Sequence, residues 1–266
     1  MHNVKHKSIG RILDLLEVLP LSVSLKTSKF NLFQSLYLPH FKFRDNDILV
    51  ISSKYVSMSE GSVRRLDSVK RISGRAIDLA SKYHMNAKLV ELVIRESDYI
   101  FKGIPGFLLA IKDGIIAPNA GIDKSNVSSG FVILYPRQPF KTAENLRRKF
   151  LLNLGIKVMI IIADSRLMPT RIGTTGIAIS CAGFEPVEDQ RGKTDLFGNI
   201  LKVTLKAVAD SLATIGVSAM GESNELIPAV VIRNIKVIAT DRKLSWHDMA
   251  VDATEDIYMR AVQYQN

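Results

Sequence analysis

Three acidic residues, Asp123, Asp164 and Glu222, each stand in a polar stretch directly beside an apolar segment of the chain. Carboxylates without accompanying histidine or cysteine are hard oxygen ligands, which proteins use to bind Mg²⁺ or Mn²⁺. Such ions commonly bridge protein carboxylates to the phosphates of a substrate. Each acid taken alone is also an ordinary residue for a helix cap or a solvated loop. The three together indicate a metal–nucleotide site, which other features of the chain must support.

Signatures of other chemistries are missing from the sequence. Gly192-Lys193-Thr194 resembles the end of a P-loop, but Val187 occupies the position of its first glycine. The five histidines are scattered without metal-ligand spacing, which argues against zinc, and there is no G-x-S-x-G motif. Cys181 lies in an apolar segment and predicts a buried thiol. A single cysteine forms no internal disulfide, which favours a reducing, cytoplasmic setting.

The acid at position 164 follows the longest uncharged apolar run, residues 158–163. This run predicts a buried strand, and Asp164-Ser165-Arg166 is then expected to open a polar loop before a second apolar run. A buried strand that delivers an acid, a hydroxyl and a cation at its carboxyl end is an arrangement that open sheets use for ligand sites.

Apolar periodicity and capping residues predict the remaining elements. Strands are expected over 47–52, 131–136 and 229–232, and a hairpin over 107–118 that turns at Asp113-Gly114. Helices are expected over 68–84, after a cap at Asn86, over 143–154 between Thr142 and Gly155, over 203–215, and after Ser245 and Asp248. Residues 184–198 read as a long polar loop. Because strands and helices do not alternate strictly, the sequence favours an α+β fold or a mixed sheet.

A chain of 266 residues allows one large domain or two modest ones, and we expect a single domain over 1–266, with two lobes as an alternative. Its net charge of +10 fits plain solubility or a small anionic ligand better than nucleic acid, because no basic run alternates with aromatic residues. No apolar run approaches the ~20 residues of a membrane span. Asp14 and Glu17 interrupt the apolar segment 12–25, which argues against a signal peptide. Residues 1–45 give no clear pattern.

Seven segments match one known family in order and spacing: 45–54, 93–98, 119–127, 163–165, 191–198, 207–210 and 220–233. They read DNDILVISSK, VIRESD, NAGIDKSNV, ADS, RGKTDLFG, AVAD, and MGE followed by IPAVVIR. Together they resemble the γ-glutamyl ligase family that acts on the deazaflavin coenzyme F-420. The resemblance covers about residues 45–235, whereas residues 1–45 and the C-terminal helix match only loosely.

The resemblance implies a mixed α+β fold with largely antiparallel sheets, packed helices and an intertwined homodimer. It also implies a GTP- and Mg²⁺- or Mn²⁺-dependent reaction that adds L-glutamate to a carboxylate of the small anionic coenzyme precursor through an acyl phosphate. Its implied metal ligands are Asp123, Asp164, Ser165 and Glu222, and its implied nucleotide-binding residues are Ser53, Lys54, Asn126, Met220, Gly221, Ser223 and Asn224. Asp164 and Arg171 are the expected catalytic residues.

The sequence departs from the family pattern at three positions. Leu167 and Met168 stand where typical members carry a Gly-Arg pair, and Met58 stands where many carry a lysine. Arg166 and Arg171 are candidates to replace the lost cation, because a guanidinium binds carboxylate or phosphate bidentately. Three alternatives therefore stay open. They are the same chemistry on a folate-like or other pterin carboxylate, a non-catalytic relative that binds a nucleotide or coenzyme, and a nucleic-acid-binding role.

Overall fold

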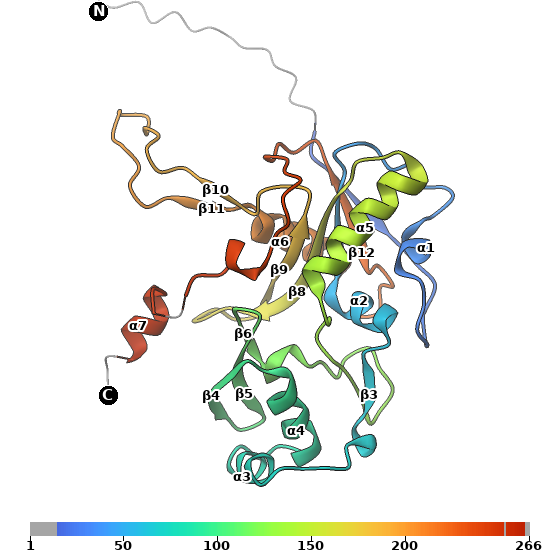
Figure 1. Cartoon of the computed structure of the whole chain (residues 1–266), viewed down its shortest axis with the longest axis vertical. Coiled ribbons are helices and arrows are strands. Elements are labelled where there is room, and N and C mark those ends of the chain that lie inside the picture. Colours follow the sequence, from blue (N-terminus) through green and yellow to red (C-terminus); the bar gives the residue numbers. More distant parts are fainter. Residues whose placement is uncertain (1–14, 253, 264–266) are drawn as a thin grey trace, which may run out of the picture.

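The computed structural model describes residues 15–252 and 254–263 and has an α+β fold with several mostly antiparallel sheets (Figure 1). The predicted fold class is therefore confirmed. Residues 1–14, on which the prediction about a signal peptide partly rests, lie outside the described ranges. Among the described residues, none of the helices combines the length and the apolar composition needed to cross a membrane.

A five-stranded sheet forms the centre of the larger part of the molecule. Its spatial order is β1 (Glu17–Leu21), β12 (Ala229–Arg233), β2 (Ile48–Ser52), β8 (Met159–Leu167) and β9 (Thr174–Ala182). Only the β2–β8 pair within this sheet is parallel. Because that pair is central, its strands are covered on both faces, which explains their continuous apolar sequences.

Helices cover both faces of the central sheet (Figure 1). On one face lie α1 (Leu32–Leu36), α2 (Ser53–Glu60) and α5 (Pro139–Leu154), and on the other lies α6 (Val208–Met220). Side chains of β8 alternate between the two cores, with Ile160 and Ile162 in the first and Ile161 and Ala163 in the second. The same alternation decides the direction of the polar residues that follow.

A smaller lobe, at the bottom of Figure 1, has its own apolar core. It contains η1 (Leu66–Ser68), α3 (Gly74–Lys82), α4 (Ala87–Glu96), β4 (Tyr99–Ile104), β5 (Phe107–Lys112), β6 (Ile115–Pro118) and η2 (Asn119–Gly121). A short antiparallel pair, β3 (Val63–Arg65) with β7 (Phe131–Ile133), leads between this lobe and the central sheet.

A hairpin arm projects from the larger part, opposite α5 in Figure 1. Its base is the antiparallel pair β10 (Val187–Asp189) and β11 (Leu205–Ala207), and residues 190–204 form its outer end. The described chain ends with η3 (Trp246–Asp248) and α7 (Ile257–Gln263).

Several predicted elements are confirmed, namely the strand at β2, the hairpin of β5 and β6, the helix capped by Asn86, and the strand at β12. Gly155 ends α5 with a φ of 69°, a left-handed conformation that suits glycine. The strand predicted over 131–136 forms, but it ends at Ile133.

Several other boundaries were predicted wrongly. Helix α3 begins at Gly74, because the Ser73 hydroxyl accepts the N–H of Ala76. Helix α5 begins at Pro139, where a missing N–H is harmless, and Thr142 instead donates to Glu60.

The segment 203–215 begins as strand β11, because residues 205–207 pair with 187–189, and only then becomes α6. The same pairing makes part of the predicted 184–198 loop a strand. Ser245 and Asp248 are hydrogen-bonded as predicted, but they open the single turn η3 and not the final helix.

Candidate active site

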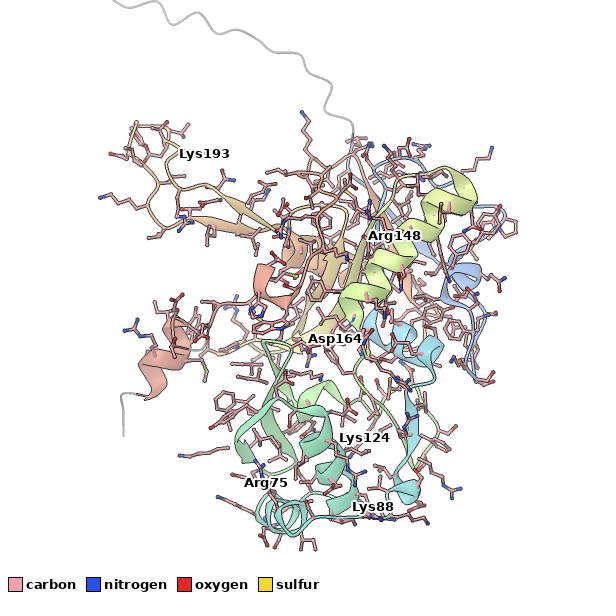
Figure 2. All side chains as sticks on the ribbon, viewed as in Figure 1. Arg75, Lys88, Lys124, Arg148, Asp164 and Lys193 are labelled. Atoms are coloured by element: carbon pink, nitrogen blue, oxygen red, sulfur yellow. The ribbon has the colours of Figure 1, made fainter. Side chains whose placement is uncertain are left out.

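A cavity of about 380 Å³ gathers the predicted acids from three distant parts of the sequence. Figure 2 places Asp164 where the larger part of the molecule meets the smaller lobe. The lining residues are Ser53, Lys54, Ser57, Phe107, Pro118, Asn119, Gly121, Ile122, Asp123, Ser125, Ile133, Leu134, Tyr135, Pro136, Asp164, Ser165, Arg166, Leu167, Thr174 and Glu222.

Asp164 lies inside strand β8 and not in a loop after it, which corrects the sequence prediction. Strand β9 pairs with β8 as far as Leu167, so the strand continues through the polar residues. Parallel pairing of Ser52 with Ala163 brings the residues that follow them together, namely Ser53 at the start of α2 and Asp164 in β8. As a result, the Ser53 hydroxyl donates to Asp164 Oδ1 over 2.7 Å.

Asp123 is held by two donors from two chain segments. Lys54 Nζ lies 2.9 Å from its Oδ2, and the backbone N–H of Ser125 donates to Oδ1 over 2.7 Å. Lys54 also donates to the Ser125 hydroxyl over 2.8 Å. Burial raises the pKa of Asp123, but the Ser125 N–H and the Lys54 ammonium outweigh this effect, and the net pKa lies below its usual value. The carboxylate is therefore charged at neutral pH.

Glu222 reaches the cavity from the loop that follows α6. Its Oε1 accepts from the Ser165 hydroxyl over 2.6 Å and from the Thr174 hydroxyl over 3.4 Å. Ser165 points to the face of β8 that α6 covers, whereas Asp164 points to the α2 face, as the alternation along a strand requires. The two faces of one strand thus deliver two predicted metal ligands.

The loops that carry Asp123 and Glu222 are tied together. Asn126 Nδ2 donates to the backbone oxygen of Ser223 over 3.1 Å, and the Ser223 N–H donates to Glu225 over 2.8 Å. Gly221 has a φ of 77°, and a Cβ atom there would collide with the Glu225 carboxylate. The glycine therefore permits the tight turn that presents Glu222.

Backbone conformation at Asn119, Ala120 and Gly121 is left-handed at all three residues, with φ values of 53°, 53° and 71°. Non-glycine residues adopt this region rarely and at a cost in conformational energy. Asn119 stabilises the turn by accepting the backbone N–H of Leu108 over 3.0 Å. The turn brings the Cα of Gly121 against the guanidinium of Arg166.

Arg166, which the sequence offered with Arg171 as a candidate to replace the lost cation, lines the cavity, whereas Arg171 does not. The Arg166 side chain is 5% exposed, and its Nε lies 2.9 Å from Asp164 Oδ2. Arg166 and Asp164 are two residues apart in a strand, so both side chains lie on the same face. The sequence analysis placed Arg166 in a loop, and this spacing puts it on the Asp164 face of β8 once the segment is recognised as a strand.

Six of the twelve predicted site residues do not line the cavity, namely Asn126, Arg171, Met220, Gly221, Ser223 and Asn224. Arg171 lies in the exposed turn between β8 and β9, and Met220 is buried at the end of α6 in the second core. Asn224 lies in the exposed loop after Gly221. Ser53, Lys54, Asp123, Asp164, Ser165 and Glu222 do line it. Within residues 15–252 and 254–263, no three His, Cys, Asp or Glu side chains cluster closely enough to chelate an ion by themselves.

Comparison with known proteins identifies the family of the chain. Residues 26–234 match the family described as F420-0:Gamma-glutamyl ligase. A Coenzyme F420:L-glutamate ligase of Archaeoglobus fulgidus is 36% identical over 222 residues, 84% of this chain and 88% of the relative. A protein of the same name from Methanocaldococcus jannaschii is 38% identical over 198 residues, 74% of this chain and 79% of the relative.

A third relative with this name, from Methanococcus maripaludis, is 35% identical over 227 residues, 85% of this chain and 91% of the relative. The matched region contains the acids of the cavity and the residues that orient them. The resemblance seen in the sequence is confirmed, and the chain belongs to the F420-0:γ-glutamyl ligase family.

Proposed function

We propose that the chain is a γ-glutamyl ligase that joins the amino group of L-glutamate to a carboxylate of the coenzyme F420 precursor. The observation that best supports this is the convergence of Asp123, Asp164 and Glu222, with Lys54, on one cavity. GTP transfers its γ-phosphoryl group to the acceptor carboxylate and leaves as GDP. The glutamate amine then attacks the acyl phosphate, phosphate leaves, and the amine loses a proton as the amide bond forms.

The residues of the chain orient the phosphate-binding groups in this proposal. Lys54 supplies positive charge beside Asp123, and Ser53 holds the Asp164 carboxylate by a hydrogen bond. The linked loops at Asn126 and Ser223 would enclose the nucleotide. Phosphoryl transfer depends mostly on such positioning and charge stabilisation. Met220, whose side chain is buried, would contribute only through its backbone.

The predicted metal ligands fit a hard divalent cation in their chemistry. All four line the same cavity and carry oxygen atoms. Asp123 and Asp164 would bind one ion, and Ser165 and Glu222 would bind a second. Bound Mg²⁺ or Mn²⁺ would neutralise charge on the transferred phosphoryl group. Because the acids do not form a cluster of three by themselves, phosphate oxygens of the nucleotide would complete the coordination.

A different carboxylate acceptor is the second candidate function, and residues 167 and 168 favour it. Leu167 and Met168, which replace the Gly-Arg pair of typical family members, are 55% and 43% exposed, and Leu167 lines the cavity. Apolar side chains there suit a folate-like or other pterin acceptor that lacks a phosphodiester. A non-catalytic coenzyme-binding protein is a further alternative, against which the intact set of acids argues.

One assay tests the proposal and its alternatives. The purified chain is incubated with L-glutamate, Mg²⁺ or Mn²⁺, GTP or ATP, and either the deglutamylated coenzyme or a folate, and mass spectrometry detects the glutamyl adduct. A metal-dependent adduct of the coenzyme is the expected result. An adduct formed only with the folate would replace the first candidate by the second. Nucleotide binding without any adduct would favour the non-catalytic alternative.

We also propose that the protein is a homodimer that buries the hairpin arm. Leu196 and Phe197 at the end of the arm are 99% and 91% exposed. The Asp195 carboxylate accepts the backbone N–H groups of Phe197 and Asn199, each over 2.8 Å, which fixes the loop with both apolar side chains outward. Large apolar side chains presented in this way are typical of a protein interface.

A further inference from the structure

Unsatisfied buried polar atoms concentrate at the cavity. In the described part of the chain, seven buried side-chain polar atoms have no hydrogen-bond partner. Four of the seven belong to three cavity-lining residues: Arg166 Nε and Nη2, Tyr135 Oη and Ser57 Oγ. Buried polar groups in folded proteins are almost always hydrogen-bonded, and an unpaired one destabilises the fold. The missing partner is therefore expected to come from a ligand in the cavity.

The guanidinium of Arg166 has unused donors although an acid lies beside it. Its Nε is 2.9 Å from Asp164 Oδ2, but the Nε–H does not point at that oxygen and makes no hydrogen bond with any described atom. Asp164 uses its other oxygen to accept from Ser53. The contact is thus an ion pair without a hydrogen bond, and the Nε–H and Nη2–H donors on one planar edge of Arg166 have no acceptor among the described atoms. Such an edge matches the two oxygens of a carboxylate.

Tyr135 supplies a second donor next to Arg166. A Cβ atom placed on Gly121 would lie 2.9 Å from Tyr135 Cδ2 and 3.0 Å from Arg166 Nη2, so both side chains meet at this glycine. The tyrosine is 3% exposed, and burial raises the pKa of its hydroxyl far above the usual value, while the charge of Arg166 acts in the opposite direction. The hydroxyl is therefore protonated and able to donate. Ser57, fully buried on α2, offers a further hydroxyl.

The donors define the charge of the missing partner. A metal ion has no lone pair to offer these donors, whereas the oxygens of an anion accept hydrogen bonds, and Arg166, Tyr135 and Ser57 all line the cavity in which such an anion would lie. Asp164 already balances the charge of Arg166, so a dianion bound here would be repelled more strongly by Asp164 than a monoanion would be. The chemistry therefore selects a monoanion with two coplanar oxygens.

We propose that Arg166 and Tyr135, with Ser57 beside them, form a substrate-carboxylate subsite adjacent to Asp164. This inference rests on the proposed function for the choice of ligand, since a γ-glutamyl ligase has two carboxylic substrates, the acceptor and L-glutamate. Arg166 is a binding residue in this scheme, and it lies directly before Leu167 and Met168, where the chain departs from its family.

Binding measurements on the full-length chain test the subsite without requiring turnover. L-Glutamate and the deglutamylated coenzyme are titrated separately, by calorimetry with Mg²⁺ and GDP present so that no phosphoryl transfer occurs, into the wild type, R166K, R166Q and Y135F. We expect R166Q to weaken the binding of one of the two ligands about 10- to 100-fold, since a charge-assisted hydrogen bond is lost. The ligand affected identifies which carboxylate is held. R166K keeps the positive charge but not the forked donors of the guanidinium, so its affinity for that ligand should lie between those of the wild type and R166Q.

Y135F separates ligand binding from a structural role. Its hydroxyl has no described protein partner, so the variant should unfold at the same temperature as the wild type or higher, yet bind the same carboxylate about 3- to 10-fold more weakly. R148Q is the control, because Arg148 is an exposed arginine of α5 that pairs with Glu144 and does not line the cavity, and its binding should equal that of the wild type.

Unchanged affinity for both carboxylates in R166Q and Y135F would overturn the subsite, as would a wild type that binds neither. A wild type that binds a carboxylate through Arg166 but forms no adduct would refute the proposed ligase activity and leave the subsite standing. Thermal unfolding of R166Q shows whether that variant is folded. If it is not, R166K and Y135F decide the question.

Discussion

Each acid of the cavity has a neighbour that keeps it oriented. Asp123 forms an ion pair with Lys54. Asp164 accepts a hydrogen bond from Ser53 and forms an ion pair with Arg166, and Glu222 accepts a hydrogen bond from Ser165. A carboxylate whose lone pairs already accept hydrogen bonds loses little conformational freedom when a cation or nucleotide arrives. If the proposed function holds, the cavity is therefore arranged in advance for a nucleotide and its metal ions.

Replacing Asp164 by asparagine should abolish metal-dependent ligation, with a loss of at least about 10²-fold in kcat, because an amide does not supply the required negative charge. Arg166 would lose its neighbouring charge, so we expect the free energy of unfolding to fall by about 3 kcal/mol, which a folded domain tolerates. Mass spectrometry of the adduct and urea unfolding measure the two effects.

Asp67→Asn is the matched control for this variant, because Asp67 is an exposed acid paired with Lys88 in the smaller lobe. Its turnover should equal that of the wild type. Undiminished turnover in Asp164→Asn would show that Asp164 is neither a metal ligand nor a catalytic residue.

Replacing Lys54 by methionine should give a stability loss that depends on pH. Asp123 has a lowered pKa in the folded chain, so its ion pair stabilises the fold above its unfolded pKa of about 3.9, and this contribution disappears as pH falls through the lower folded pKa. The difference in unfolding free energy between Lys54→Met and the wild type should therefore be present at pH 7 and vanish in acid. The pair is partly exposed, which limits the difference to about 1 kcal/mol.

Urea unfolding at pH 7 and at pH 3 measures this difference. Lys149→Met is the control, because Lys149 is an exposed lysine of α5 that forms no ion pair among the described residues. Its difference in unfolding free energy from the wild type should be small and equal at both pH values. A pH-independent loss in Lys54→Met would mean that the lysine contributes by packing and not by pairing with Asp123.

At the scale of elements, apolar runs and caps were enough to predict β2, β12, the β5–β6 hairpin and α4. Strand β8 was cut short in the prediction because Asp164, Ser165 and Arg166 are polar, although they remain paired with β9. Polarity marks exposure in most strands, but here the polar residues face a cavity at the end of the sheet. Local sequence does not contain that information, because cross-strand pairing is a long-range property.

Helix α6 sets the position of Glu222 by packing closely on the central sheet. A Cβ atom on Gly216 would lie 2.6 Å from Val50 Cγ1, so β2 and α6 approach at this glycine. Gly216→Ala should therefore lower the free energy of unfolding by about 1–3 kcal/mol, although alanine favours a helix intrinsically by about 1 kcal/mol.

Gly74→Ala, also in a helix, is the control, because no atom lies within 4 Å of the added Cβ. Its stability should equal or slightly exceed that of the wild type in urea unfolding. A Gly216→Ala variant as stable as Gly74→Ala would show that α6 has room to move from β2.

At the scale of the whole molecule, the sequence predicted the fold class, and the family resemblance carried most of the prediction of the cavity. The single-domain assignment over 1–266 remains a prediction. Figure 1 shows two lobes, which is the arrangement that the sequence analysis gave as its alternative. The arm was interpreted as a polar loop, because Lys193, Asp195 and their neighbours dominate the composition of residues 184–198. Its function depends on where Leu196 and Phe197 point, which only the folded chain reveals.

Phe197→Ser tests the proposed dimer at the outer end of the arm, where Figure 2 labels the nearby Lys193. Burying a phenylalanine side chain contributes about 1.5–3 kcal/mol per copy, and a two-fold dimer buries it twice. Its loss should therefore weaken association by about two to four powers of ten. Sedimentation at several protein concentrations measures the change.

Leu152→Ser is the control, because Leu152 is a leucine of α5 that is 83% exposed. This change removes comparable apolar surface away from the arm, so it should leave association unchanged. A dimer that survives Phe197→Ser but dissociates in Leu152→Ser would place the interface on α5 instead.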